Sequence, residues 1–145
     1  MKNVILFLLL QGVVFTACNS FNKTAEEEKV KKVIDAYFKA IQSNDYEQMK
    51  ANTTNDYLLF ESGKVWNNDS LWNEIQKFKD NTIRFSINSH SIEIDQRFAH
   101  VVYFNHGDIY QNDSLMSRMD WIESATLKKI DGQWKIFFLH STQRD

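Results

Sequence analysis

The sequence has little of several residue types on which common functional classes depend. Its single cysteine, Cys18, excludes an intramolecular disulfide framework and any zinc or iron–sulfur site built from several cysteines. Four glycines, at positions 12, 63, 107 and 132, cannot make a dinucleotide-binding fingerprint or a phosphate-binding loop. Lys and Arg number 17 against 19 Asp and Glu, so the basic excess of a nucleic-acid-binding protein is missing. Proline is absent, and no linker composition divides the chain.

The first eighteen residues have the pattern of an export and lipidation signal. Lys2 precedes an apolar run, Val4–Leu10, that resumes at Val13 and is too short to span a membrane. The segment Val14–Cys18 resembles a bacterial lipobox, which implies that Cys18 carries lipid and begins the mature chain. The alternative is an ordinary secretory signal with an incidental cysteine. The expected organisation is a signal peptide at 1–17, lipidated Cys18 with a tether at 18–24, and one domain at 25–145, anchored at the membrane surface of the bacterial cell envelope.

Apolar residues at three- and four-residue spacings predict helices in the first half of the domain. Residues 25–43 carry such a stripe, with Thr24 as the expected N-cap. The acidic residues that follow Thr24 suit the positive end of the helix dipole and are interpreted as solvated capping groups. The remaining elements expected in this half are a helix at 45–51 capped by Asp45, a strand at 57–60 that turns into 65–66, and a helix capped by Asp69 or Ser70 that continues to Phe78.

The second half changes to the period of two that predicts strands. Ile83, Phe85 and Ile87 alternate on one parity, while Ile92 and Ile94 alternate on the other, which predicts a β-bulge near 88–91. The dipeptide at 131–132, Asp-Gly, is a strong hairpin signal. Further strands are expected at 97–105, 118–130 and 133–142, with a polar loop at 107–117. Helices followed by four antiparallel strands indicate the α+β class.

The predicted terminal hairpin places Glu123 directly opposite His140. Counting outward from the turn pairs 130 with 133, then 129 with 134, and so on. The more aromatic face then holds both residues among Trp121 and Phe138, and we assign that face to the core. Directly opposed residues lie about 4.5–5.5 Å apart at Cβ, so a hydrogen bond is within reach. Such a pair serves as a structural contact, a ligand contact or an acid/base dyad, and its proximity alone does not decide which.

Counting from the turn at 95–96 adds Tyr103 and Asn105 to the same inner wall, together with His90. His100 and His106 fall on the opposite face at a spacing that suits no metal, so neither a metal site nor a cofactor is predicted. An outer apolar stripe of Phe137, Leu139 and Ile122 predicts a homodimer. The candidate catalytic residues are His140, Glu123 and Tyr103, and the candidate ligand-binding residues are Glu123, His140, Tyr103, Asn105, Trp121, Phe138 and His90.

The ending Lys129–Ser141, with its Asp-Gly-Gln-Trp-Lys-Ile core and its His-Ser close, resembles the terminal hairpin of the SnoaL-like branch of the nuclear-transport-factor-2-like superfamily. The order of elements is similar to that branch from about Glu26 to Thr142. The resemblance implies a cone-shaped, cystatin-like α+β fold in which N-terminal helices pack in the concave face of a curved antiparallel sheet. It also implies a cavity at the open end of the cone. Members include cyclases, isomerases, dehydratases and non-enzymatic domains, so the fold does not decide the function.

Three functions follow as hypotheses from these residues. The first is a membrane-anchored domain that binds a small, partly apolar molecule, because aromatic residues make up 14% of the chain and few polar groups accompany them on the inner face. The second is an acid/base cyclase, isomerase or dehydratase, in which His140 moves a proton, Glu123 orients it and Tyr103 donates to an oxyanion. The third is a dimeric interaction module without catalysis.

Overall fold

A computed structural model describes residues 21–144, and for 89 and 90 it describes the backbone alone. The expected signal peptide and the expected lipidation of Cys18 lie outside the described residues. The elements, in chain order, are α1 (Lys23–Gln42), α2 (Tyr46–Ala51), β1 (Thr53–Glu61), β2 (Lys64–Trp66), α3 (Asn68–Ile75), the 3-10 turn η1 (Gln76–Phe78), β3 (Thr82–Ile94), β4 (Phe98–Gln111), β5 (Ser114–Ile130) and β6 (Gln133–Gln143).

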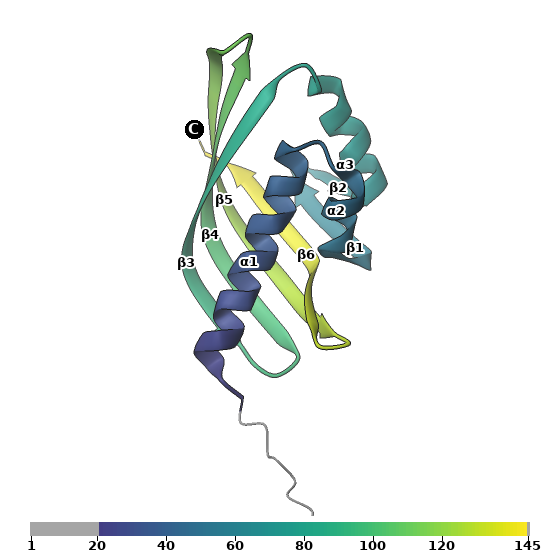
Figure 1. Ribbon diagram of the computed structural model, residues 1–145, viewed down its shortest axis with the longest axis vertical. Coiled ribbons are helices and arrows are strands. Elements are labelled where there is room, and N and C mark those ends of the chain that lie inside the picture. The colour runs from purple at the N-terminus through teal and green to yellow at the C-terminus, as the bar shows by residue number, and fades with distance from the viewer. Residues whose placement is uncertain (1–20, 145) are drawn as a thin grey trace, which may run out of the picture.

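The strands form one six-stranded sheet that curves around α1, as Figure 1 shows. Its order is β2-β1-β6-β5-β4-β3, and every neighbouring pair is antiparallel except β1 and β6, which run parallel. The helices α2 and α3 stand beside β1 and β2, at the other side of the concave face from β3. The α+β class and the cone-shaped arrangement are therefore confirmed.

The long helix α1 is held by an apolar stripe that faces the sheet. Val30, Ile34, Tyr37 and Phe38 all lie in the buried core, at the three- and four-residue spacings of one helix face. Its N-cap is Asn22 rather than the expected Thr24, because the Asn22 side chain accepts a hydrogen bond from the backbone N–H of Ala25 at 3.1 Å. The helix therefore begins inside the segment that the sequence assigned to the tether.

Of the two other predicted helix N-caps, the one of α2 is confirmed and the one of α3 is wrong. Asp45 caps α2 as expected, with its side chain accepting from the backbone N–H of Gln48. The N-cap of α3 is Asn67, not Asp69 or Ser70; Ser70 instead completes a capping box by accepting from the Asn67 backbone N–H. None of the helices in the described residues is long and apolar enough to cross a membrane.

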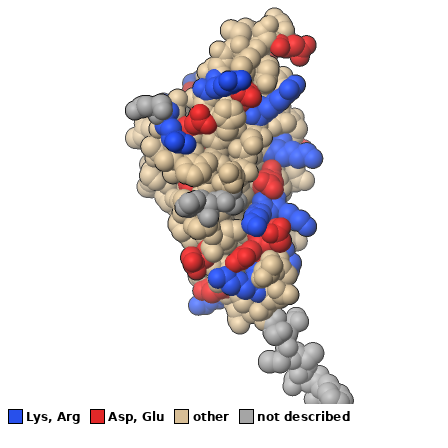
Figure 2. Space-filling view, turned by 90° about the vertical axis from the view of Figure 1, so that its left-hand side faces the viewer, with Lys and Arg blue, Asp and Glu red and all other residues tan. Residues whose placement is uncertain are grey.

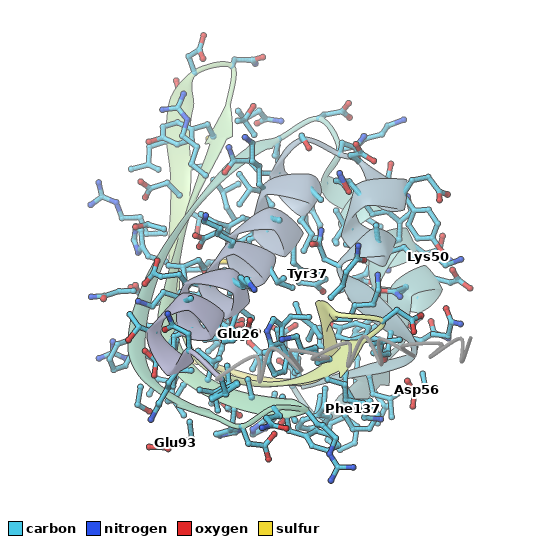
Figure 3. All side chains as sticks on the ribbon, turned by 60° about the horizontal axis from the view of Figure 1, so that its bottom comes forward. Glu26, Tyr37, Lys50, Asp56, Glu93 and Phe137 are labelled. Carbon is cyan, nitrogen blue, oxygen red and sulfur yellow. The ribbon has the colours of Figure 1, made fainter. Side chains whose placement is uncertain are left out.

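One acidic residue of the first helical turn is not solvated as expected. Glu26 is buried and accepts hydrogen bonds from Trp134 Nε1 at 2.7 Å and from Lys129 Nζ at 2.6 Å, with Lys29 on its other oxygen. The hydrogen bonds from Lys129 and Lys29 are the main reason that the pKa of Glu26 falls to about 2. Figure 3 shows Glu26 between α1 and the sheet. This contact fastens the start of α1 to the β5–β6 hairpin.

The segment 107–117 is not a loop. β4 continues to Gln111, a two-residue turn of Asn112 and Asp113 follows with both residues at positive φ (49° and 61°), and β5 begins at Ser114. Asn and Asp tolerate that left-handed conformation, which a tight hairpin turn requires. The tip projects beyond the rest of the sheet in Figure 1, so most of its side chains are solvated and carry no apolar alternation. The alternation of apolar and polar residues therefore could not predict a strand in this segment.

The bulge predicted in β3 is confirmed. The pairing with β4 shifts between Ser89 and Ser91, which leaves residue 90 without a partner across this ladder. On the far side of the bulge Ile92 pairs with Val101, two residues beyond the Ala99 that a two-residue turn at 95–96 would give, and this even shift leaves the predicted faces unchanged. Tyr103 and Asn105 consequently lie on the inner face, where both are buried.

The terminal hairpin follows the predicted register only for its first four pairs. Ile130 to Leu127 pair with Gln133 to Ile136 as expected, but Thr126 then pairs with Phe138, so Phe137 is an extra residue in β6. Every later pair is displaced by one. The predicted pairing of Glu123 with His140 is therefore wrong: Glu123 pairs with Ser141, and His140 pairs with Ser124.

The same bulge reassigns the two faces of β6. Leu139 is buried in the core, so its predicted place in the outer apolar stripe is wrong. Phe137 does lie on the outer face, where Lys128 Nζ stands 3.2 Å from its ring centre, and Ile122 is 45% exposed. The homodimer expected through that face stays a prediction. On the face drawn in Figure 2, acidic and basic side chains are interspersed.

Candidate functional site

A cavity of about 290 Å³ lies between the C-terminal half of α1, α3 and the concave face of the sheet. Apolar side chains from all three elements make up most of its wall, because the stripe of α1 and the inner residues of the strands converge there without filling the space. The lining residues are Tyr37, Phe38, Ile41, Leu59, Glu61, Leu71, Glu74, Ile75, Phe78, Ile83, Phe85, Asn105, Ile109, Met119, Trp121, Glu123, Leu139 and Ser141.

Four polar residues form one row across the sheet at one end of the cavity, whereas Asn105 pairs with Trp121 beside this row and Glu74 lies on α3. Tyr103 of β4 pairs with Glu123 of β5, Glu123 pairs with Ser141 of β6, and Ser141 pairs with Glu61 of β1. The parallel pairing of β1 with β6 brings Glu61 into this row from the first strand of the chain. Two carboxyl groups thus stand on either side of one serine at the same end of the cavity.

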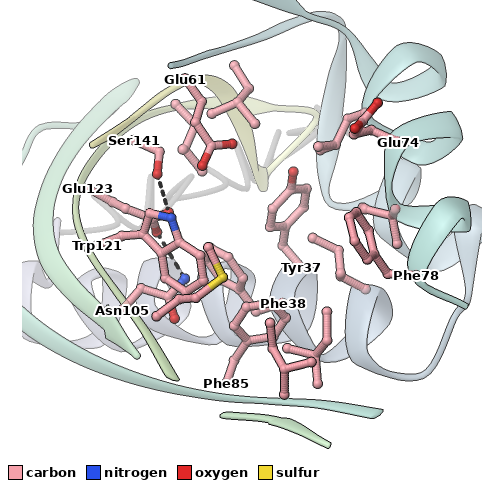
Figure 4. Close-up of a pocket in the computed structure, with 18 residues that line it drawn as sticks. Tyr37, Phe38, Glu61, Glu74, Phe78, Phe85, Asn105, Trp121, Glu123 and Ser141 are labelled. Atoms are coloured by element: carbon pink, nitrogen blue, oxygen red, sulfur yellow. Dashed lines mark hydrogen bonds between the residues drawn. The ribbon is translucent and has the colours of Figure 1, made fainter. Parts of the chain in front are cut away.

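Glu123 is the centre of the hydrogen-bond network in Figure 4. Its Oε1 accepts from Ser141 Oγ at 2.9 Å, and its Oε2 accepts from Asn105 Nδ2 at 3.3 Å. The hydroxyl of Tyr103 approaches the same carboxyl without completing a hydrogen bond. The carboxyl is thereby fixed in orientation by residues from the neighbouring strands.

The carboxyl of Glu123 titrates near neutrality. Burial, which leaves only 5% of the residue exposed, raises the pKa of Glu123 to about 7, and the neighbouring Glu61 adds to that rise. Hydrogen bonds from Ser141 and Asn105, together with the nearby Tyr103 hydroxyl, lower the pKa and only partly offset the burial. Burial also raises the pKa of Glu61, while the Trp121 side chain lowers it. Glu123 therefore exchanges its proton in the physiological pH range, which suits an acid/base group or a charge-sensing contact.

Two close contacts position the rings of Tyr37 and Trp121 in the cavity wall. Tyr37 Oη and Tyr57 Oη lie 2.8 Å apart, which turns the Tyr37 ring into the cavity from α1. Trp121 packs over Gly107 so tightly that a Cβ at position 107 would lie 2.9 Å from the Trp121 ring. The absence of a side chain at Gly107 is what lets the indole lie against the sheet and line the cavity.

The candidate residues separate into three groups. Glu123, Asn105 and Trp121 line the cavity, and Tyr103 is fully buried beside Glu123. The other candidates do not line it: Phe138 packs on the outer face against Phe60 at 5.0 Å between ring centres, His140 is exposed there, and the side chain of His90 is not described. The bulge at Phe137 is the physical reason for the displacement of Phe138 and His140.

Three polar residues of the cavity wall, Ser141, Glu61 and Glu74, were not predicted from the sequence. Counting from the hairpin turn places Ser141 on the outer face, because nothing in the sequence marks the bulge. The segment 61–64, Glu-Ser-Gly-Lys, has the composition of a turn, which places Glu61 outside the strand. Tyr57, Leu59 and Glu61 nevertheless alternate on one side of β1, and the first two are buried. That alternation is the signal that could have placed Glu61 inside. The described residues contain no group of three His, Cys, Asp or Glu side chains arranged to hold a metal ion.

Comparison with known proteins identifies relatives of this fold. A family model described as "SnoaL-like domain" matches residues 30–143. A ketosteroid isomerase-like protein from Erwinia carotovora atroseptica superposes with a TM-score of 0.69 and 18% identity, covering 86% of this chain and 99% of that one. A conserved protein from Planctomyces limnophilus gives 0.73 and 13%, covering 83% and 98%. A cystatin-like protein of unknown function from Nostoc punctiforme gives 0.68 and 12%, covering 83% and 92%. No curated protein matches the chain.

The raised pKa of Glu123 predicts a pH-dependent stability. Because the folded pKa of about 7 lies above the ordinary 4.5, the folded state keeps a proton that the unfolded chain has lost. The wild type should therefore lose stability relative to Glu123→Gln as pH rises from 4.5 to 7, by an amount on the order of 3 kcal/mol, and then level off. Urea unfolding of both proteins at pH 5 and pH 8 measures this difference. The exposed Glu93→Gln is the matched control, and equal gaps at both pH values would contradict the prediction.

Proposed function

Since the chain belongs to the SnoaL-like domain family, we propose that it binds a small, partly apolar molecule in the cavity between α1, α3 and the sheet. The observation that carries the proposal is an unfilled volume of about 290 Å³ with a largely apolar wall, between α1, α3 and the sheet. Protein interiors leave few voids larger than a water molecule, and ligand sites commonly begin near 300 Å³. An apolar wall with a few fixed polar groups at one end is the usual composition of such a site.

A second candidate function is proton transfer to and from a bound substrate. It is supported by the position of Glu123, which lies on the cavity wall with a pKa of about 7, next to the hydroxyl of Tyr103. A base whose pKa lies near the working pH is efficient, and a nearby phenol can donate to an oxyanion. His140 has no part in this version, because it faces away from the cavity. The likeness to the Erwinia ketosteroid isomerase-like protein suggests isomerase chemistry as the first reaction to test.

We further propose that the domain is carried on the bacterial cell envelope by lipid on Cys18. The support is in the sequence: a cationic start at Lys2, a short apolar run, and the lipobox-like Val14–Cys18. The helix N-cap at Asn22 follows only a few residues later, so the tether would be short. Lipid chains contribute about 0.8 kcal/mol per buried CH₂ to membrane binding.

Filling the cavity should abolish ligand binding. Met119→Trp adds a large side chain to the cavity wall, whereas Met116→Trp makes the same change at a position that is 60% exposed on the same strand. We expect Met119→Trp to weaken binding of the neutral fluorophore N-phenyl-1-naphthylamine at least tenfold, and Met116→Trp to leave it unchanged. Fluorescence titration gives both affinities. Wild-type protein that fails to bind the fluorophore, or a Met119→Trp variant that binds it normally, would count against the cavity as a binding site.

If the site transfers protons, it should convert a β,γ-unsaturated ketone into its conjugated isomer. The absorbance of the conjugated product follows the reaction. The rate should rise with pH through about 7 as Glu123 loses its proton, and Glu123→Gln should lower it by about 10²–10⁴-fold. Glu93→Gln is the control on the exposed surface. A rate that survives Glu123→Gln would remove this residue as the base.

Lipidation can be tested in a bacterial host that expresses the full chain. Metabolic labelling with an alkyne-tagged palmitate should mark the wild type and leave it in the membrane fraction. Cys18→Ser should lose the label and the membrane association. Unlabelled, soluble wild-type protein shortened at its N-terminus would instead identify an ordinary secretory signal.

A further inference from the structure

The polar end of the cavity is acidic and carries no compensating cation. Glu61 and Glu123 are the ionisable acids of this end, and no Lys, Arg or His stands among the described side chains that line the cavity. The third lining acid, Glu74, lies across the cavity on α3 and is already paired with Lys77 at 2.5 Å. A bound carboxylate or phosphate would meet like charge in a site of low dielectric constant, which costs binding free energy. The charge of the wall therefore disfavours anionic ligands and favours cationic ones.

The hydrogen-bonding inventory of the same end points in the same direction. Asn105 is only 2% exposed, yet its Oδ1 has no hydrogen-bond partner within the described residues. Its Nδ2 is already used on Glu123, so the group left over is an acceptor. Together with the carboxyl oxygens of Glu61 and Glu123, it gives this part of the cavity wall more acceptors than donors; the hydroxyl of Tyr103, also without a partner in the described part of the chain, is not part of the cavity lining. A buried acceptor without a donor is costly, and a ligand that donates hydrogen bonds removes that cost.

Aromatic rings stand beside these acceptors. Figure 4 shows Phe38, Phe85 and Trp121 grouped next to Asn105 and Glu123. Phe38 and Phe85 lie 5.1 Å apart between ring centres, and Phe85 and Trp121 lie 6.4 Å apart. A cation is attracted to the faces of such rings, most strongly to Trp. The wall thus offers a cation both negative charge and aromatic faces.

We propose that the ligand is an organic cation, with an ammonium group held between Glu61, Glu123 and Asn105 Oδ1 and an apolar body along the aromatic wall. This inference rests on the proposed binding function and names the chemical class of its ligand. An ammonium group supplies up to three donors and one positive charge, which matches the acceptors and the two carboxyl groups on either side of Ser141.

Binding of such a cation is coupled to proton release. The titratable groups that face Glu123 are Tyr37 of α1, Tyr57 and Glu61 of β1, and Tyr103 of β4. Burial raises the pKa of all three tyrosines, so these phenols are neutral at physiological pH and the glutamates carry the charge. An ammonium group favours the ionised carboxyls, so affinity for the cation should increase between pH 5.5 and pH 8.

The experiment compares three ligands with the same apolar body: octylamine, octanol and octanoate. Displacement of N-phenyl-1-naphthylamine from the wild-type protein at pH 8 should give octylamine at least a tenfold higher affinity than octanol, with octanoate weakest. Glu123→Gln and Glu61→Gln should each bring the amine-to-alcohol ratio close to one, whereas Glu93→Gln should leave it unchanged. Met119→Trp should abolish displaceable binding of all three. At pH 5.5 the amine should lose affinity and the alcohol should not.

The outcomes separate this inference from the proposed function. If the fluorophore binds and octanol or octanoate displaces it as well as octylamine does, the cation preference is overturned while the binding function stands. The cation preference is also overturned if the fluorophore binds and none of the three ligands displaces it, or if the amine-to-alcohol ratio survives both Gln variants. If the fluorophore itself does not bind to the wild type, the binding function fails, and the inference fails with it.

Discussion

The site depends on a single extra residue in the last strand. Phe137 has no partner across the β5–β6 ladder, and the strand therefore changes parity within one step. Beyond it Leu139 enters the core and Ser141 meets Glu123, while His140 turns to solvent. Without the bulge, an imidazole would occupy the place of the serine hydroxyl. A local change in backbone pairing thus sets the chemistry at the end of the cavity.

The sequence predicted the elements whose apolar pattern is unambiguous, and it failed where pattern is absent. The stripe of α1 and the parity change in β3 were both readable from spacing. The run Phe137–Leu139 is apolar at every position, so nothing in it marks where parity changes. In the polar segment 107–117 only Gly107 and Ile109 are buried or line the cavity, too few to show an alternation, and the residues around the turn are exposed. The parallel pairing that brings Glu61 beside Ser141 joins distant segments, and no local signal specifies such a contact.

The row of polar residues across the sheet lowers the stability of the folded state. Two carboxyls and an unsatisfied amide oxygen lie where apolar side chains would pack at a lower desolvation cost. The other buried acid, Glu26, shows the opposite solution, since lysine and tryptophan donors stabilise its charge. The ionised carboxylate of Glu26 is paired with lysine and joins α1 to the sheet. Among the described residues, the carboxyl groups of Glu61 and Glu123 have no such cation and join no helix to the sheet. Residues that fold a protein and residues that serve a ligand often differ in this way.

The direction of α1 has a consequence for how the domain is presented to its surroundings. The helix is 20 residues long, which corresponds to about 30 Å, and its cavity-lining residues Tyr37, Phe38 and Ile41 lie in its last two turns. The start of the helix is fastened to the sheet through Glu26. The proposed attachment at Cys18 would therefore hold the domain at the end of α1 that is remote from the cavity.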